Sequence, residues 1–240
     1  MELDVLLIIS LGIFLGFFIQ TIIGFSGALV ALPILLISIA LPEAISYISI
    51  FYFLSSIYLV QKEWTNINKK VIVKLALTSI IGLAAGISIL SFGNLIFLKK
   101  VLGIFIILYV IYSYFSKGKI KKSSFLEYVL GIFGGFFSGL FSTGGPLFVI
   151  VVKNATKDIK TFRATMFGVL GLVSIIRVPL IAISGILKLN HLYYALFIMP
   201  FFLLSIFLGK KMYSKLNEQL IKNCVLVALL FSGIMLAFKS

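Results

Sequence analysis

Residues 142–150 read STGGPLFVI and interrupt a chain that is apolar almost everywhere. Serine, threonine, paired glycines and a proline are typical of a turn that leads into the first turn of a helix. A backbone break that faces lipid would leave polar groups without hydrogen bonds, so it is tolerated only where protein or a watery cavity surrounds it. We therefore predict that a helix begins here, inside a membrane protein, with Ser142 or Thr143 as its cap.

The composition of the chain supports a membrane setting. Of its 240 residues 61% are hydrophobic, 24 are Phe, and the mean hydropathy is +1.21, whereas soluble domains are about 45–50% apolar. The first apolar run, 5–23, follows Glu2 and Asp4 and has no small-residue cleavage site after it, which predicts a retained helix and not a cleaved signal. The single cysteine, Cys224, lies in the last apolar run, so we expect no disulfide framework.

A second break, GFSG at 24–27, is related to the first by a shift of 118 residues. The shift places Gly16 on Gly134 and Gly27 on Gly145. The other matching segments are 44–60 with 162–178, 71–91 with 189–209 and, after a five-residue gap, 97–102 with 220–225. Since the order and the lengths of these segments agree, we predict an internal duplication. Its repeats cover approximately 1–116 and 125–240 of a single transmembrane domain, 1–240.

The apolar runs predict an all-α, polytopic transmembrane protein with about 8–10 membrane segments, because a helix needs about 20 residues to cross the hydrocarbon core. The runs at 28–41 and 146–152 are too short for ordinary spans, and each directly follows a break. Two arrangements remain open at 5–41 and 125–152. Either these regions are hairpins of broken or re-entrant helices, or each of their arms crosses the membrane completely.

The charges indicate how the chain crosses the membrane. The net charge is +14, and fifteen of the 21 basic residues fall in four segments: 61–70, 117–124, 153–163 and 209–222. Cytoplasmic loops are rich in Lys and Arg, so the pattern predicts topology in a lipid-surrounded cell membrane protein and not nucleic-acid binding. With both termini outside, all four segments are cytoplasmic, and Lys99 and Lys100 are the exceptions. The two repeats then run in opposite directions, an architecture common in secondary transporters.

The two breaks also predict a binding site for a small anionic substrate. The free N–H groups and the dipole of a helix N-terminus favour negative charge, and two such ends would converge from opposite sides of the membrane. We expect the substrate to contact both breaks, the polar residues before them and one arginine. The candidate residues are Gln20, Thr21, Gly24, Phe25, Ser26, Gly27, Ser138, Ser142, Thr143, Gly144, Gly145, Pro146 and Arg177.

Glycines also permit close helix packing, which is the alternative role for Gly144 and Gly145. Packing is the expected role of the glycines at four-residue spacing. These are Gly12, Gly16, Gly82, Gly86, Gly131, Gly135 and Gly139.

Arg177 is the only basic residue near the centre of a predicted span. A charge in that place is expensive and usually faces a cavity or a partner. No predicted span has a central acid, so the partner would be an anionic substrate or the backbone carbonyls at a break. The alternative is that the span is offset and that Arg177 snorkels to the interface, aided by Pro179.

The sequence contains no motif of a known enzyme class. HExxH, GxSxG, Walker A and metal-ligand clusters are all absent, and the acidic residues lie at loop edges. We therefore expect a protein that is not an enzyme and that carries no cofactor or metal. The oligomeric state stays open, a homo-oligomer included.

The second copy, GGFFSGLFSTGGPLFVI at 134–150, resembles the TauE/SafE family of sulfite and organosulfonate exporters. The glycines and the proline of that family stand at Gly135, Gly139, Gly144, Gly145 and Pro146. The first copy keeps Gly24, Gly27 and Pro33 but has Ser26 and Ala28 where glycine is usual.

The resemblance implies a transporter of small sulfur-containing anions such as sulfite, thiosulfate or organosulfonates. From the inverted repeats we expect it to work by alternating access. A passive anion channel and an accessory or scaffold protein that moves nothing are the alternatives.

Overall fold

The computed structural model describes residues 2–115, 123–213 and 218–238, and these residues form α-helices joined by short connections. The helices are α1 (Leu3–Ile23), α2 (Gly27–Leu35), α3 (Leu41–Glu63), α4 (Lys69–Phe92), α5 (Leu95–Phe115), α6 (Ser124–Phe141), α7 (Gly145–Ala155), α8 (Ile159–Ile183), α9 (Leu189–Tyr213) and α10 (Glu218–Phe238). A 3-10 turn, η1 (Trp64–Asn66), follows α3. The predicted all-α class is confirmed.

Seven of the described helices are long and apolar enough to cross a membrane, so the chain is a multi-pass membrane protein. They are α1, α3, α4, α5, α6, α8 and α9. By contrast, α2 has 9 residues and α7 has 11, about half the length that a crossing needs. The two short runs that follow the breaks are therefore not ordinary spans, as the sequence indicated.

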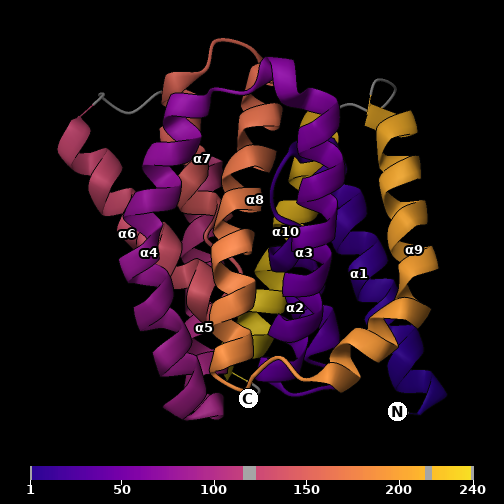
Figure 1. The fold of residues 1–240 in the computed structure, drawn as a ribbon. Helices are drawn as coiled ribbons and strands as arrows, with labels where there is room; N and C mark the ends of the chain where they lie inside the picture. The colour runs from indigo at the N-terminus through magenta and orange to yellow at the C-terminus, as the bar shows by residue number, and fades with distance from the viewer. Residues whose placement is uncertain (1, 116–122, 214–217, 239–240) are drawn as a thin grey trace.

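In both broken regions the short helix after the break folds back against the long helix before it. A Cβ added at Gly16 would meet Gly27 and Ala31, and one at Gly12 would meet Leu35, so α2 runs back along α1. In the same way Phe148 of α7 lies against Gly134 of α6. The chain reverses through left-handed residues, with φ of 95° at Gly24, 76° at Ser26 and 61° at Ser142. Figure 1 shows both hairpins within the bundle.

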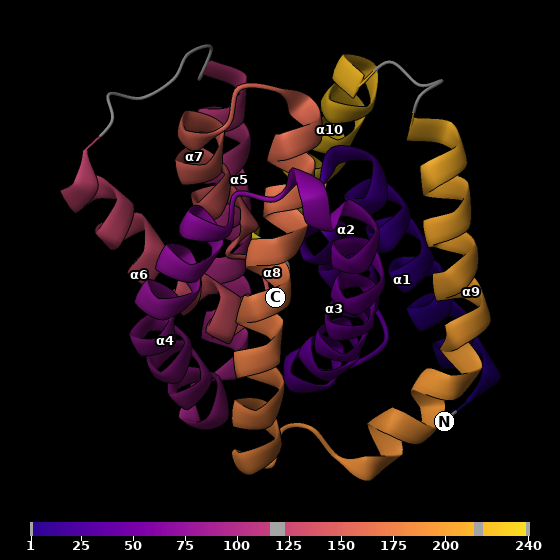
Figure 2. The same cartoon turned by 45° about the horizontal axis from the view of Figure 1, so that its top comes forward.

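The helices form three groups across the molecule (Figure 2). α3 packs against α8 at the centre, α4 packs against α6 on one side, and α1 packs against α9 on the other. α5 packs against α10 behind them in the view of Figure 1. The long hydrophobic residues of α1, α2, α3 and α8 supply much of the buried core.

Glycine packing is confirmed where α4 meets α6. A Cβ at Gly82 would overlap the carbonyl of Ile132, one at Gly86 would overlap that of Phe136, and one at Gly139 would overlap that of Leu83. The two backbones therefore touch along this face, which is the role that small residues play between membrane helices.

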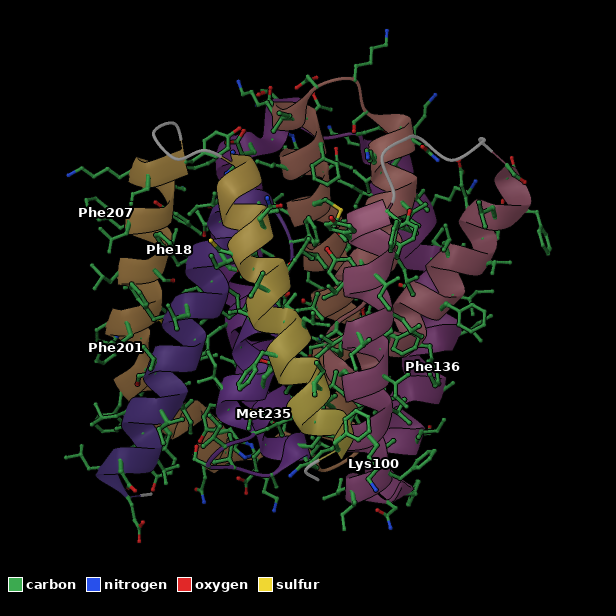
Figure 3. All side chains as sticks on the ribbon, turned by 180° about the vertical axis from the view of Figure 1, so that it is seen from behind. Phe18, Lys100, Phe136, Phe201, Phe207 and Met235 are labelled. Atoms are coloured by element: carbon green, nitrogen blue, oxygen red, sulfur yellow. The ribbon has the colours of Figure 1, made fainter. Side chains whose placement is uncertain are left out.

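The described parts of the basic segments gather at one end of the bundle, here called the basic end. η1, the connection between α7 and α8, and the last turn of α9 all lie there (Figure 1). Residues 117–122 of the remaining basic segment and 214–217 of the segment after α9 lie outside the described residues. α1 begins and α10 ends at the opposite end, and Lys100 lies there too (Figure 3). That the basic end faces the cytoplasm stays a prediction.

The order of helix lengths repeats along the chain. A long helix, a short one and three long ones form α1–α5, and α6–α10 follow the same order. The predicted shift pairs α4 with α9 and α1 with α6, so the α4–α6 contact corresponds to the α9–α1 contact, and both are present. In Figure 1, α1 runs toward the basic end and α6 runs away from it.

Candidate functional site

The two breaks, far apart in the sequence, lie side by side in the interior of the bundle. A Cβ placed on Gly145 would lie 3.6 Å from Cβ of Phe25 and 4.0 Å from the backbone N of Ser26. Ser26, Ser142 and Thr143 are all buried. The N-termini of α2 and α7 thus meet, and the structure brings together the two groups of candidate residues at 24–27 and 142–146.

The start of α2 has a hydrogen-bond partner on a neighbouring helix. The backbone N–H of Ala28 donates to the hydroxyl of Tyr52 on α3, with an N–O distance of 3.0 Å. The side chain of Ser26 lies near Tyr109 of α5. Ser26 does not cap α2 with its own side chain, and its backbone is left-handed, whereas capping residues usually have an extended backbone.

The start of α7 is left with polar atoms that have no partner. The hydroxyl oxygens of Ser142 and Thr143 are buried and make no hydrogen bond within the described chain. The prediction that one of them caps α7 is wrong. The residue at the cap position is Gly144, and no side chain bonds to the helix end. Ser142 is instead the residue that ends α6, and its backbone is left-handed.

Arg177 is 2% exposed and is one of the largest fully buried side chains of the protein. The structure therefore shows no snorkelling. Nη1 donates to the carbonyl of Ser138, in the last turn of α6, over 3.1 Å. Nε and Nη2 have no hydrogen-bond partner among the described residues. The guanidinium carbon lies 5.7 Å from the centre of the Tyr52 ring, which places Arg177 near the phenol that bonds the start of α2.

Gln20 and Ser138 lie beside the breaks as predicted, whereas Thr21 has another role. Nε2 of Gln20 reaches Oγ of Ser55 at 3.5 Å, and its buried Oε1 has no partner within the described chain. The Thr21 hydroxyl donates to the carbonyl of Phe17 at 2.7 Å, and its side chain packs against Gly209 of α9. At the break, therefore, it is the backbone carbonyl of Thr21 and not its hydroxyl that contacts another helix.

That carbonyl accepts a hydrogen bond from Arg163, a residue that the sequence reading counted only as part of a basic loop. Arg163 is 7% exposed. Its Nη2 donates to the Thr21 carbonyl, and its guanidinium carbon lies 3.5 Å from the centre of the Tyr213 ring. A Cβ at Gly24 would meet the Arg163 side chain at 3.1 Å. Arg163 thus holds the end of α1.

The two arginines of α8 make equivalent hydrogen bonds, one at each hairpin. Arg163 bonds the carbonyl end of α1, and Arg177 bonds the carbonyl end of α6. A spacing of 14 residues brings them back to within about 40° around the helix. This spacing is the signal that the sequence offered for Arg163. Because the carbonyl end of a helix carries partial negative charge, each guanidinium stabilises a helix end that would otherwise be exposed in the interior.

A cavity of about 380 Å³ leads from the basic end to the junction of the breaks. Its lining includes Phe25 and Pro146 from the two breaks and Lys153 and Lys157 from the end of α7 and the connection to α8. Its walls come from α5 and α7 and the connection between α7 and α8. The lining residues are Ile23, Phe25, Tyr109, Tyr112, Ser113, Pro146, Val149, Ile150, Lys153, Thr156, Lys157, Asp158, Ile159 and Phe162.

Asp158 is the one acidic residue of this lining, and it is engaged with the start of α8. Its carboxylate accepts hydrogen bonds from the backbone N–H and the hydroxyl of Thr161, each over 2.8 Å. The bond from the Thr161 backbone lowers the pKa of Asp158 below its usual value, so the group stays ionised as a helix cap. The lysines beside it keep the mouth net positive.

Comparison with known proteins gives two matches to the chain. The family model described as "Sulfite exporter TauE/SafE" matches residues 8–236. A probable membrane transporter protein of Methanocaldococcus jannaschii is 28% identical over 194 residues, which are 73% of this chain and 73% of that protein. No solved structure matches the chain.

Proposed function

Since this chain belongs to the TauE/SafE family and is a membrane transporter, we propose that it moves small sulfur-containing anions by alternating access. Sulfite, thiosulfate and organosulfonates are the substrates that the family suggests. The anion would be held where the two breaks meet and would reach that place from the basic end through the cavity between α5 and α7.

The buried guanidinium of Arg177 carries the proposal. A buried charge without a partner costs several kcal/mol. Arg177 has one bond to a backbone carbonyl and two nitrogens without a partner in the described chain. The ion pair found among the described residues, Lys74 with Glu127 at 2.6 Å, joins α4 to α6 and does not involve Arg177. An anion supplied by the substrate would provide the missing charge and accept both N–H groups.

The neighbouring groups suit an oxyanion. The unpartnered hydroxyls of Ser142 and Thr143 can donate hydrogen bonds, and the starts of α2 and α7 add helix dipoles of the right sign. An anion with three oxygens on sulfur can accept from several donors at once. The donors explain why the substrate would be a small, negatively charged ion, and the family suggests that sulfur is its central atom.

Alternating access is supported by the arrangement of the repeats. The two hairpins run in opposite directions, and equivalent helix pairs are in contact. In transporters with inverted repeats, the substrate lies between broken helices while one repeat moves against the other. Lys153 and Lys157 at the cavity raise the local concentration of anions at its mouth.

Counterflow in proteoliposomes tests the proposal. Purified protein is reconstituted, the vesicles are loaded with unlabelled thiosulfate or sulfite, and uptake of the radiolabelled anion is followed. A carrier accumulates label transiently, and uptake depends on the anion inside. A passive channel gives flux without this stimulation, and an accessory protein gives none, so either result would overturn the proposal.

A further inference from the structure

We propose that an anionic phospholipid binds in a hollow between α2, α5 and α10, at the end of the bundle opposite the basic end. The phosphate of the lipid pairs with Lys99, and one acyl chain lies against the apolar walls. Neither break contributes to the lining, so the site is separate from the one proposed for the transported anion. The lining residues are Pro33, Ile34, Leu36, Ile37, Lys99, Phe231, Ser232, Met235 and Leu236.

The hollow combines apolar walls with one cationic side chain. Its volume is about 500 Å³, within the range of about 300–1,000 Å³ that is typical of small-ligand pockets. Seven of its nine lining residues are apolar, and the two exceptions are Lys99 and Ser232. A ligand that fits both parts must itself be amphiphilic, with a long apolar portion and a negatively charged group.

The apolar walls face the membrane lipid. Ile37 is 74% exposed, Phe231 is 67% exposed and Met235 is 42% exposed. In a multi-pass membrane protein, apolar side chains that are open to the surroundings contact acyl chains. A lipid therefore reaches the hollow from the side, without entering the bundle.

Lys99 lies at the depth where the lipid headgroups begin. α5 has 21 residues, about 31 Å of helix, which matches a hydrocarbon core of about 30 Å. Lys99 is the fifth of these residues, about 6 Å from the start of the helix. Phe231 lies seven residues before the end of α10, about 10 Å along its axis. A phosphate beside Lys99 thus places the acyl chain of the same lipid beside Phe231.

The ammonium of Lys99 has no partner of opposite charge within the described chain, where the ion pair found joins Lys74 to Glu127. Lysines of the basic segments have aromatic partners instead. Nζ of Lys69, for example, lies 4.6 Å from the centre of the Trp64 ring. No such ring contact to Lys99 is present among the described residues. A cation at the edge of the hydrocarbon core is costly unless it is paired, so the lipid phosphate supplies the missing charge.

The neighbouring Lys100 favours a lipid with a net negative charge. Lys100 is exposed at the end of the bundle toward which Met235 also lies (Figure 3). Two adjacent lysines repel the ammonium of a zwitterionic headgroup, whereas the glycerol headgroup of phosphatidylglycerol carries no positive charge. Each lysine near an anionic headgroup raises the affinity about fivefold. The site therefore gives a function to the two lysines that the charge pattern leaves unexplained.

Fluorescence quenching by brominated lipids tests the site. Trp64, the single tryptophan of the chain, is replaced by Phe, and Phe231→Trp introduces a reporter into the hollow. The full-length reporter protein is reconstituted into phosphatidylcholine bilayers that contain increasing fractions of phosphatidylglycerol with bromine on its acyl chains. The quenching gives the relative binding constant of the two lipids at this position. Met235→Trp serves as a second reporter where the first is poorly produced.

We expect phosphatidylglycerol to bind the reporter protein at least fivefold more tightly than phosphatidylcholine. Lys99→Gln should lower this ratio at least threefold, and Lys99→Arg should preserve it, because the arginine keeps the charge. Lys188→Gln is the matched control. Lys188 is exposed in the connection between α8 and α9, at the same end of the bundle, and does not line the hollow, so the ratio should stay unchanged in this variant.

A ratio near one in the reporter protein would overturn the proposal, as would a ratio that survives Lys99→Gln or falls equally in Lys188→Gln. Soluble glycerol 3-phosphate distinguishes a lipid site from a site for free phosphate. It should leave the quenching unchanged at millimolar concentration. Relief of the quenching would show that the hollow binds the free anion, and the lipid assignment would then be wrong.

Discussion

The two hairpins share one architecture, but their breaks differ in how many polar groups are satisfied. At the first break, Tyr52 bonds the start of α2 and Arg163 bonds the end of α1, while Oε1 of Gln20 and Nε of Arg163 have no partner in the described chain. At the second break, the hydroxyls of Ser142 and Thr143 have no partner in the described chain. Buried polar groups in folded proteins are normally paired. Under the proposed function, the first break would act as a support, and the substrate would supply the missing partners at the second.

Removing the charge of Arg177 should lower anion affinity more than any other change at the two breaks. In Arg177→Gln the substrate loses its charged partner, and truncating one member of a buried charged pair costs about 2–5 kcal/mol. We expect anion affinity to fall by a factor of about 100 or more, as measured by binding to purified protein and by counterflow.

Arg163→Gln is the matched control, because it removes the other buried arginine of the same helix. It should lower the thermal stability of the protein, since the carbonyl end of α1 loses its donor, while anion affinity changes by less than about threefold. Equal losses of affinity in the two variants would contradict the assignment of different roles to the two breaks.

The two glycines of the second break should respond differently to substitution. A Cβ at Gly144 would overlap the carbonyl of Gly134 and Oγ of Ser138, whereas one at Gly145 meets Phe25 at an ordinary 3.6 Å. Gly144→Ala should therefore destabilise the protein by about 1–3 kcal/mol, measured as a lower melting temperature in detergent, and Gly145→Ala should be close to neutral.

A longer side chain at Gly145 should separate folding from transport. Gly145→Leu extends into the space beside Phe25 and Ser26, so we expect normal membrane insertion and no counterflow. Full transport by this variant would show that the anion does not pass between the breaks.

The hydroxyls at the second break should contribute a smaller share of the affinity. Ser142→Ala combined with Thr143→Ala removes two donors that cost little to lose in the empty protein, and each bond to a charged ligand is worth about 1.5–3 kcal/mol. We expect anion affinity to fall at least tenfold and the melting temperature without anion to stay the same or rise. Ser26→Ala at the first break should leave anion affinity unchanged.

Tyr52→Phe should have the smallest effect of the series. It removes the acceptor of the Ala28 N–H group, a neutral hydrogen bond worth about 1 kcal/mol. A modest loss of stability with less than fivefold change in affinity is expected from thermal unfolding and binding measurements. A loss as large as that of Arg177→Gln would make Tyr52 a direct substrate ligand.

The positions of the breaks could be predicted from sequence because turn chemistry is local. Gly144, Gly145 and Pro146 mark a helix start whatever surrounds them. The hairpin geometry could not be predicted, because a hairpin and two complete crossings leave the basic segments on the same side. The capping prediction for Ser142 was wrong because this residue ends α6 in the left-handed conformation and Gly144 takes the cap position of α7.

Arg163 shows a different limit of the sequence. In a segment with three lysines it reads as one more loop charge, and only the fold reveals that it turns inward onto the carbonyl of Thr21. Arg177 could be selected because its neighbours are apolar, yet its bond to Ser138 depends on where α6 ends. A charged residue among apolar neighbours can be recognised in the sequence. The carbonyl that its long side chain reaches can be identified only from the fold.

The placement of both arginines on α8 makes the two hairpins mechanically dependent on each other. Fourteen residues of α-helix separate the two attachment points by about 21 Å and transmit an axial displacement with little loss. A displacement of α8 along its axis would therefore move the attachment points of α1 and α6 together.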